Sequence, residues 1–266
     1  MPLLTTTDLA ISFGPHWVVQ DVSCAIERGE LVGLVGPNGA GKTSLLRALV
    51  GLIDPDRGVV RLDGRAISEM PPRQRARQIA YLPQSPTVHW PLAVRRLVAL
   101  GRLPHLDPWQ APSGEDEAAI DEALAATDIV DLQSRTLGTL SGGERRLATL
   151  ARALAVGADL LLADEPVAAL DPGHQLQVME LLARLTRSSR AAIVVLHDLT
   201  LAARFCDRLI LLHRGEIRAE GRPDQVLNDA NLAEVYGIRA RFGEPPERYI
   251  VPWERIAPNE LPRNTS

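Results

Sequence analysis

Cysteine is nearly absent from this sequence, which has two in 266 residues, Cys24 and Cys206. Two cysteines do not make a disulfide framework, and their spacing fits no metal site. We therefore expect two small buried side chains in a reducing compartment. The N-terminus lacks the basic and apolar stretches of a signal peptide, and no run approaches the roughly 18 apolar residues that a membrane helix needs. Any role at a membrane would therefore depend on a partner.

An excess of positive charge is also missing, because 29 basic and 33 acidic residues give a formal net charge of −4. Proteins that bind nucleic acid owe much of their affinity to excess lysine and arginine, so we expect no nucleic acid partner. Hydrophobic residues make up 45% of the chain and charged residues 23%, which is ordinary for a globular protein. A chain of this length suits one α/β domain with an inserted subdomain.

Apolar runs that alternate with helical patterns predict a mainly parallel sheet with helices on both faces. Residues 3–12 and 17–26, separated by Gly14-Pro15, predict an antiparallel pair of strands. The further predicted strands are Leu31–Val35, Gly58–Leu62, Ile79–Leu82, Leu160–Ala163, Ala192–Leu196 and Arg208–Leu212. The predicted helices outside the insertion are Ser44–Leu52, Arg145–Val156, Gly173–Arg187 and Leu199–Phe205.

Two segments depart from this alternation. Residues 88–139 carry several prolines, an acidic segment and an Ala/Leu-rich pattern over Ala118–Ala126, and we expect them to form a helical insertion. From Gly237 the chain carries five prolines, and we expect it to be irregular. We therefore divide the chain into a domain over residues 1–236, with the insertion at about 88–139, and a tail over residues 237–266.

A glycine-rich loop between a predicted strand and a predicted helix fits G-x-x-x-x-G-K-[ST] in full. Its residues are Gly36, Pro37, Asn38, Gly39, Ala40, Gly41, Lys42 and Thr43, followed by Ser44. Glycines let a backbone wrap closely around an anion, and the loop N–H groups and the start of the helix then point at phosphates. In such a loop the lysine neutralises the β- and γ-phosphates and the Thr43 hydroxyl binds Mg²⁺. The loop predicts a nucleoside triphosphate site.

Two carboxylates follow the apolar run of residues 160–163, namely Asp164 and Glu165. Ligands of α/β sheets bind at the carboxyl ends of strands, so both acids belong near the phosphates. Asp164 suits the neighbourhood of Mg²⁺. Glu165 suits the general base that polarises the attacking water, a role worth roughly 10²–10⁴ in rate.

A second anion-binding corner is indicated at Leu140–Glu144, where Ser141 and two glycines, Gly142 and Gly143, precede a helical pattern. One domain has no obvious use for two phosphate cradles on one triphosphate. A symmetric pair does, because each subunit's corner can close over the nucleotide that the other holds.

These motifs and their order resemble the ATPases of ABC transporters over roughly residues 3–236. The matching parts are the Walker A loop Gly36–Thr43, the Q-loop glutamine Gln84, the signature Leu140–Glu144, the Walker B strand Leu160–Glu165, the D-loop Ala169–Asp171 and the switch histidine His197. The resemblance implies a P-loop NTPase core with a mainly parallel sheet, an antiparallel β subdomain and an inserted helical subdomain.

The resemblance also implies roles for named residues. Glu165, His197 and Gln84 would serve hydrolysis, and Thr43, Gln84 and Asp164 would serve Mg²⁺. ATP would contact the Walker A residues and Ser44, and, across the dimer, Ser141, Gly142, Gly143, Glu144 and Asp171. Phe13 lies where the family places an aromatic that stacks on adenine, with Trp17 as the alternative. For His174 we expect a structural or dimer-interface role.

As partners the resemblance implies a second copy in a head-to-tail ATP sandwich, transmembrane permease subunits and, indirectly, a substrate-binding protein. It places the protein peripherally on the cytoplasmic face of the inner membrane. Three segments are similar to importers of ferric siderophores, haem and cobalamin: Leu170–Gln175, Val195–Leu199 and Glu234–Gly237. The closing Tyr249–Pro252 is similar as well.

The sequence departs from the family at two places. The signature helix has Arg146-Leu147 where the family often has Gln-Arg, and we expect this to alter contacts between subunits. The phosphate loop ends in Thr43-Ser44 where Ser-Thr is commoner, a change that keeps both hydroxyls.

The motifs are compatible with other functions as well. The chain could serve a transporter of another cargo, or it could be a non-transport ABC ATPase in DNA repair or translation. Those proteins usually carry long coiled coils or two fused cassettes, whereas this chain has one set of motifs and no heptad run. A regulatory nucleotide-binding module without turnover is disfavoured by the presence of Glu165 and His197.

Overall fold

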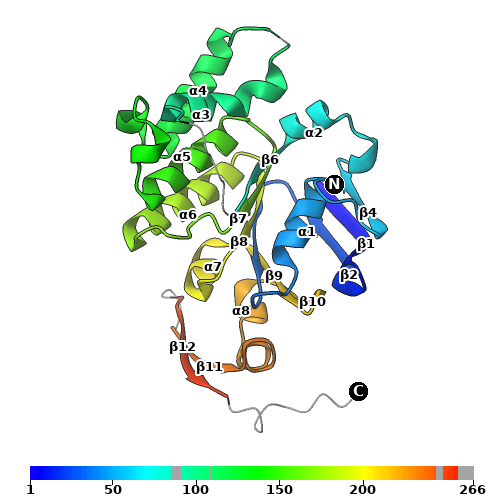
Figure 1. Ribbon diagram of the computed structural model, residues 1–266. Helices are drawn as coiled ribbons and strands as arrows, with labels where there is room; N and C mark the ends of the chain where they lie inside the picture. Colours follow the sequence, from blue (N-terminus) through cyan, green and yellow to red (C-terminus); the bar gives the residue numbers. More distant parts are fainter. Residues whose placement is uncertain (85–90, 108, 244–247, 257–266) are drawn as a thin grey trace.

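A six-stranded sheet forms the centre of the computed structural model, which describes residues 1–84, 91–107, 109–243 and 248–256 (Figure 1). Its order is β10-β9-β3-β8-β7-β6, and all neighbouring pairs are parallel except β9 with β10. The strands are β3 (Leu31–Val35), β6 (Ile79–Leu82), β7 (Leu160–Asp164), β8 (Ala191–Val195), β9 (Arg208–His213) and β10 (Glu216–Gly221). The predicted mainly parallel sheet is confirmed.

The apolar strands at the centre of the sheet are covered on both faces, which explains why they read as unbroken apolar runs. Every residue of β3, β7 and β8 is buried. Side chains of a strand alternate between faces. Thus Val32 and Leu34 of β3 pack in one core, while Leu31 and Val35 pack in the other.

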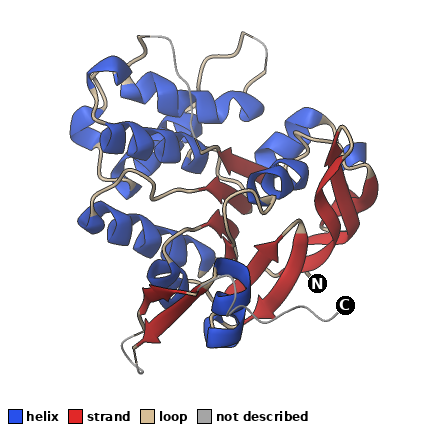
Figure 2. Cartoon of the chain, turned by 60° about the horizontal axis from the view of Figure 1, so that its bottom comes forward, coloured by secondary structure: helices blue, strands red, loops and turns tan. Residues whose placement is uncertain are grey.

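The first of these cores lies between the central sheet and a second, antiparallel sheet of order β2-β1-β4-β5. Its strands are β1 (Leu4–Phe13), β2 (His16–Ile26), β4 (Arg57–Leu62) and β5 (Arg65–Ala66). The helix α1 (Lys42–Leu49) packs in this core through Leu45, Leu46 and Leu49. In Figure 2 the antiparallel strands gather on one side of the molecule and most helices on the other. The predicted antiparallel pair 3–12 and 17–26 is confirmed.

Helices cover the opposite face of the central sheet and form the second core. They are α3 (Val94–Ala99), α4 (Gly114–Ala126), α5 (Gly142–Leu154), α6 (Pro172–Thr186) and α7 (Leu199–Phe205), with the 3₁₀ turns η2 (Leu100–His105), η3 (Val130–Leu132) and η4 (Leu137–Thr139). Within the described residues, the segment expected to be a helical insertion consists of helices, 3₁₀ turns and connecting loops, and its residues 88–90 and 108 lie outside them. Smaller helical elements elsewhere are η1 (Ile67–Glu69), α2 (Pro72–Gln78), α8 (Pro223–Val226), α9 (Asp229–Asn231) and η5 (Leu232–Tyr236).

The expectation of an irregular tail after Gly237 is wrong for its described residues. β11 (Ile238–Phe242) and β12 (Ile250–Arg255) form an antiparallel hairpin. Pro252 is tolerated because both strands of a two-stranded ribbon are edges, where proline is least costly. The hairpin docks on α7, since the Thr200 hydroxyl donates to the Ile250 carbonyl at 3.0 Å and accepts from its N–H at 3.0 Å.

Both cysteines are free thiols; Cys206 is buried and Cys24 is half-buried. Among the described residues, none of the helices has both the length and the apolar character that crossing a bilayer takes.

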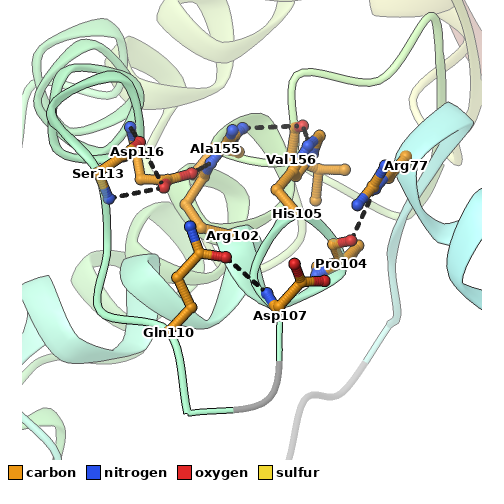
Figure 3. Close-up of polar contacts among 10 residues, drawn as sticks. All are labelled: Arg77, Arg102, Pro104, His105, Asp107, Gln110, Ser113, Asp116, Ala155 and Val156. Atoms are coloured by element: carbon orange, nitrogen blue, oxygen red, sulfur yellow. Dashed lines mark hydrogen bonds and ion pairs between the residues drawn. The ribbon is translucent and has the colours of Figure 1, made fainter.

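A buried ion pair holds the helical layer together (Figure 3). The Arg102 guanidinium donates to the Asp116 carboxylate at 2.8 Å and to the carbonyls of Ala155 and Val156 at 2.9 and 3.2 Å. Asp116 also accepts from the N–H and hydroxyl of Ser113, the N-cap of α4. The hydrogen bonds from Ser113 and Arg102 lower the pKa of Asp116 from 3.8 to about 2. The pair thus fixes the start of α4 to the end of α5.

Replacing this carboxylate should destabilise the protein measurably. Asp116→Ala leaves the Arg102 charge buried without its partner, and we expect it to lower the free energy of unfolding by about 3 kcal/mol at neutral pH. The matched control is Asp107→Ala: it removes the exposed pair with Arg73 and should cost less than about 1 kcal/mol. Because folding lowers the pKa of Asp116, its stabilising effect is present above its unfolded pKa and is lost as the pH falls toward 2. Urea unfolding of the three proteins measures both effects, and equal costs for the two substitutions would contradict this role.

Candidate active site

The phosphate loop connects β3 to α1, and two of its glycines are required by the backbone. Gly36 has φ 148° and Gly41 has φ 100°, both in the region that favours glycine. A Cβ on Gly36 would lie 2.1 Å from the carbonyl oxygen of Leu212, and one on Gly41 would lie 2.3 Å from that of Val18. The loop therefore keeps its shape only with glycine at these positions. Helix α1 begins at Lys42, two residues before the predicted start, directly after Gly41.

Lys42 is buried inside the curve of this loop, with 7% of its surface exposed. Its ammonium group donates to the carbonyl oxygens of Gly36 at 2.7 Å and Pro37 at 2.8 Å. Burial lowers the pKa of Lys42, while the nearby charges of Glu165 and Asp164 oppose that shift. The ammonium thus lies where a phosphate oxygen could replace the loop carbonyls as its acceptor.

Asp164, at the end of β7, is fully buried and lacks a well-directed hydrogen bond to any described residue through either carboxylate oxygen. Burial raises its pKa, and the neighbouring Thr43 hydroxyl opposes that shift. Burying a carboxylate costs free energy unless a cation or a hydrogen-bond donor contacts its oxygens. Asp164 and Thr43 supply the oxygen ligands that Mg²⁺ prefers, together with substrate phosphates. These residues fit a magnesium ion.

Glu165 follows directly and has a left-handed backbone with φ 54°, which is uncommon for a residue other than glycine. One carboxylate oxygen accepts from the Gln84 amide at 2.6 Å and lies 2.8 Å from Nε2 of His197. Burial alone would raise the pKa of Glu165, but hydrogen bonds from His197 and Gln84 and the charge of Lys42 outweigh it and lower the pKa. The structure thus brings together three residues from the ends of β6, β7 and β8. Two of them, Glu165 and His197, line a pocket of 210 Å³.

Removing the histidine should reverse the pKa shift of this glutamate. In His197→Ala one favourable hydrogen bond is lost while burial remains, so the pKa of Glu165 should rise. His197→Gln, which keeps a donor, is the matched control and should raise it less. The ¹³C chemical shift of the Glu165 carboxyl, followed against pH, measures the change. An unchanged titration in both variants would show that the contact does not act on Glu165.

The Ser141 corner forms the exposed start of α5. The Ser141 hydroxyl accepts from the Glu144 N–H at 3.2 Å, and Glu144 accepts from the Ser141 N–H at 2.7 Å, which is a capping box. Helix α5 packs in one core and α1 in the other, on opposite faces of the central sheet (Figure 1). The corner and the phosphate loop of one chain thus precede helices on opposite faces of the sheet.

Asp171 caps the start of α6, and its carboxylate contacts both the N–H and the ring Nδ1 of His174. The hydrogen bond to the His174 ring is the largest of the causes that lower the pKa of Asp171. Both side chains remain substantially exposed. His174 therefore orients Asp171 within the chain.

Phe13 and Trp17 lie near the tip of the β1–β2 hairpin and are 53% and 43% exposed. Trp17 directly precedes Val18, whose carbonyl lies against Gly41 of the phosphate loop. The Arg57 guanidinium covers one face of the Trp17 ring at 5.3 Å from its centroid. Trp17 is thus connected to the loop through Val18, while Phe13, at the hairpin tip, is the more exposed of the two.

Arg146 is the site residue that the sequence analysis misread. It was expected to alter contacts between subunits, but it is 6% exposed and points into its own chain. Its guanidinium donates to carbonyls at the ends of β6 and β7, including those of Gln84 at 2.8 Å and Asp164 at 2.5 Å. A signal was available: Arg146 lies four residues before the buried Leu150, and such a pair shares one face of a helix.

Comparisons with known proteins agree with this geometry. The family model described as ABC transporter matches residues 19–168. The chain is 42% identical over 252 residues to the hemin import ATP-binding protein HmuV of Pseudomonas entomophila, covering 92% of this chain and 97% of that protein. It is 36% identical over 247 residues to the probable siderophore transport system ATP-binding protein YusV of Bacillus subtilis, covering 92% and 90%. The ATP-binding cassette MJ0796, solved as a dimer in a post-hydrolysis state with ADP and Pi, is similar in fold with a TM-score of 0.74 at 27% identity, covering 83% of this chain and 98% of that one.

Proposed function

The chain belongs to the ABC transporter family and is an ATPase, and from this we propose that it energises the import of a metal chelate through a membrane permease. The cargo class that we propose is haem, a ferric siderophore or cobalamin. Support comes from relatives whose names state hemin, siderophore and cobalamin import, each at least 36% identical over about nine tenths of this chain. An ATPase for another cargo, or one outside transport, is the alternative that the experiment below separates.

Nucleotide binding follows from the phosphate loop in this proposal. The loop N–H groups and the start of α1 surround the phosphates, with contacts from Gly36 to Ser44. Lys42 exchanges its two loop carbonyls for β- and γ-phosphate oxygens, and Phe13 stacks on the adenine. Mg²⁺ would be held by Thr43, Gln84 and Asp164, where it neutralises phosphate charge and orients the phosphates.

The contacts of Glu165 carry the proposal for hydrolysis. Its pKa is lowered, so the carboxylate is ionised near neutral pH and can accept a proton. One of its oxygens accepts from the Gln84 amide and contacts Nε2 of His197. With ATP and Mg²⁺ bound, Gln84 would serve the metal and His197 would donate to the γ-phosphate, which leaves the Glu165 carboxylate to take a proton from water. The water oxygen bonds to the γ-phosphorus while the bond to the β–γ bridging oxygen breaks, which gives ADP and phosphate.

Two copies complete each site in this proposal. The Ser141 corner is exposed and starts a helix on the face of the sheet opposite α1, so we assign it to the nucleotide of a second, head-to-tail copy. Gly142, Gly143, Glu144 and Asp171 would approach the same nucleotide. Dimeric assembly of the similar cassette bound to ADP and Pi supports this arrangement.

We place the dimer peripherally on the cytoplasmic face of the inner membrane, bound to permease subunits that receive cargo from a substrate-binding protein. Import ATP-binding proteins among the relatives support this location. We further propose that the ATPase domain spans residues 1–236, with helical residues 88–139 inserted, and that residues 237–266 form an appended segment.

Reconstitution tests the cargo directly. The chain is co-purified with its permease, placed in vesicles, and supplied with haemin, a ferric siderophore or cobalamin and the substrate-binding protein. We expect ATP-dependent accumulation of one of these chelates, and none with Lys42→Ala. ATP hydrolysis without a co-purifying permease would favour a non-transport ATPase, and a permease complex that carries none of the three would indicate another cargo.

A further inference from the structure

The Arg146 guanidinium makes a set of contacts that the proposed function does not use. It donates to the carbonyl oxygens of Pro83 and Gln84 at 2.8 Å each, after β6. It also donates to the carbonyls of Asp164 at 2.5 Å and Glu165, where β7 ends, with a longer contact of 3.4 Å to Pro166. One side chain of α5 thus ties together the carboxyl ends of two neighbouring strands.

Those strand ends carry the groups proposed for hydrolysis. The backbone at residue 84 positions the Gln84 amide, and the backbone at 164 and 165 positions the two carboxylates. Glu165 is held in a left-handed conformation, which persists only where surrounding contacts impose it. The Arg146 guanidinium donates to the carbonyl oxygens of both Asp164 and Glu165, so it supplies such contacts.

Helix α5, which carries Arg146, is exposed at its start and held at its other end. Its start is the capped Ser141 corner. At its other end, the carbonyls of Ala155 and Val156 accept from Arg102, and His105 contacts Val156 at 2.9 Å (Figure 3). Arg146 lies five residues after Ser141, or about 7.5 Å along the helix axis. A displacement of the corner therefore reaches Arg146 through a short, braced stretch of helix.

We propose that Arg146 is a positioning residue that couples the two nucleotide sites of the dimer. This rests on the proposed function, in which Ser141 contacts the nucleotide held by the second copy. Closure of the corner on that nucleotide moves α5, and Arg146 passes the movement to Gln84 and Glu165 of its own chain. Each site is then set for hydrolysis by the occupancy of the other.

A guanidinium suits this task because it offers five N–H donors in a rigid plane and keeps its charge. Lysine offers donors on a single nitrogen and cannot reach carbonyls of both strands in the same way. Burial lowers the pKa of Arg146, and the charges of Asp164 and Glu165 oppose that shift. The positive charge thus remains beside the two carboxylates.

The test compares Arg146→Met and Arg146→Lys with wild type by ATPase kinetics over a range of ATP concentrations. The matched control is Arg152→Met, because Arg152 is half-buried on the same helix and its side chain bonds no described residue. We expect Arg146→Met to lower kcat about tenfold or more, to change KM less than about threefold, and to reduce the Hill coefficient toward 1. Arg146→Lys should show the same changes at smaller size, and Arg152→Met should match wild type.

A purely structural role would instead lower activity only as the folded fraction falls, with the Hill coefficient unchanged. Circular dichroism melts therefore accompany each assay. If Arg146→Met does not fold, the inference is tested with Arg146→Lys alone. A wild-type kcat and a wild-type Hill coefficient in Arg146→Lys would overturn it. If the wild-type protein does not hydrolyse ATP at all, the proposed function is contradicted. If the wild-type protein hydrolyses ATP and the Arg146 variants have the same kcat and Hill coefficient, only the inference about Arg146 is overturned.

Discussion

Glu165→Gln is expected to lower kcat by roughly 10²–10⁴ while leaving ATP binding intact. The amide keeps the size of the side chain, but it cannot take the proton of the attacking water. The phosphate loop and Lys42 are untouched, so the dimer should close on ATP and remain closed. The variant should elute as a dimer with ATP and as a monomer without it.

The control for this prediction is Glu180→Gln, an exposed glutamate on α6, which should keep wild-type turnover and dimerise only transiently. Single-turnover assays with radiolabelled ATP, run beside size-exclusion chromatography, report both properties. Rapid hydrolysis by Glu165→Gln would contradict the assignment of Glu165 as the general base. A monomer in the presence of ATP would instead count against the sandwich.

Ser141→Arg is expected to abolish hydrolysis while ATP still binds. A long charged side chain at this exposed corner would fill the space that the nucleotide of the second copy needs. The substitution also breaks the capping box of α5, which costs about 1 kcal/mol of stability. That loss is small against the free energy of folding of a domain, so the protein should remain folded.

Ser113→Arg controls for the capping loss, because Ser113 forms the equivalent box at the start of α4. It should be less stable than wild type but still hydrolyse ATP. Nucleotide binding is followed with a fluorescent ATP analogue, and turnover by phosphate release. Normal turnover by Ser141→Arg would show that the corner has no part in the reaction.

Burial on both faces is what made the central strands predictable. β3, β7 and β8 are buried throughout, so each reads as an apolar run between a turn and a helix. β10 was not predicted, because its alternating half-exposed pattern contains charged residues. The β11–β12 hairpin was missed because it is ordered by docking on α7, through Thr200 and Ile250, rather than by its own sequence pattern.

The residues of the candidate site also differ in how far the sequence predicts them. The phosphate loop is contiguous in sequence, and its glycines could be identified from spacing alone. Gln84, Glu165 and His197 are far apart along the chain, and the resemblance to a family, rather than any local pattern, brought them together. The left-handed backbone of Glu165 and the inward direction of Arg146 depend on tertiary packing that no local signal encodes fully.

Mixing two inactive variants tests the composite site most directly. Lys42→Ala disables the phosphate loop and Ser141→Arg blocks the Ser141 corner, so the homodimer of each variant should be inactive. Half of the randomly formed dimers are mixed, and each of these contains one site built from an intact loop and an intact corner, so about a quarter of wild-type ATPase activity is the upper limit. The other site of a mixed dimer cannot hold ATP, so the proposed coupling through Arg146 places the recovered activity below this limit but clearly above that of either variant alone. A mixture as inactive as its components, or a wild-type monomer that hydrolyses ATP at the full rate, would contradict the account.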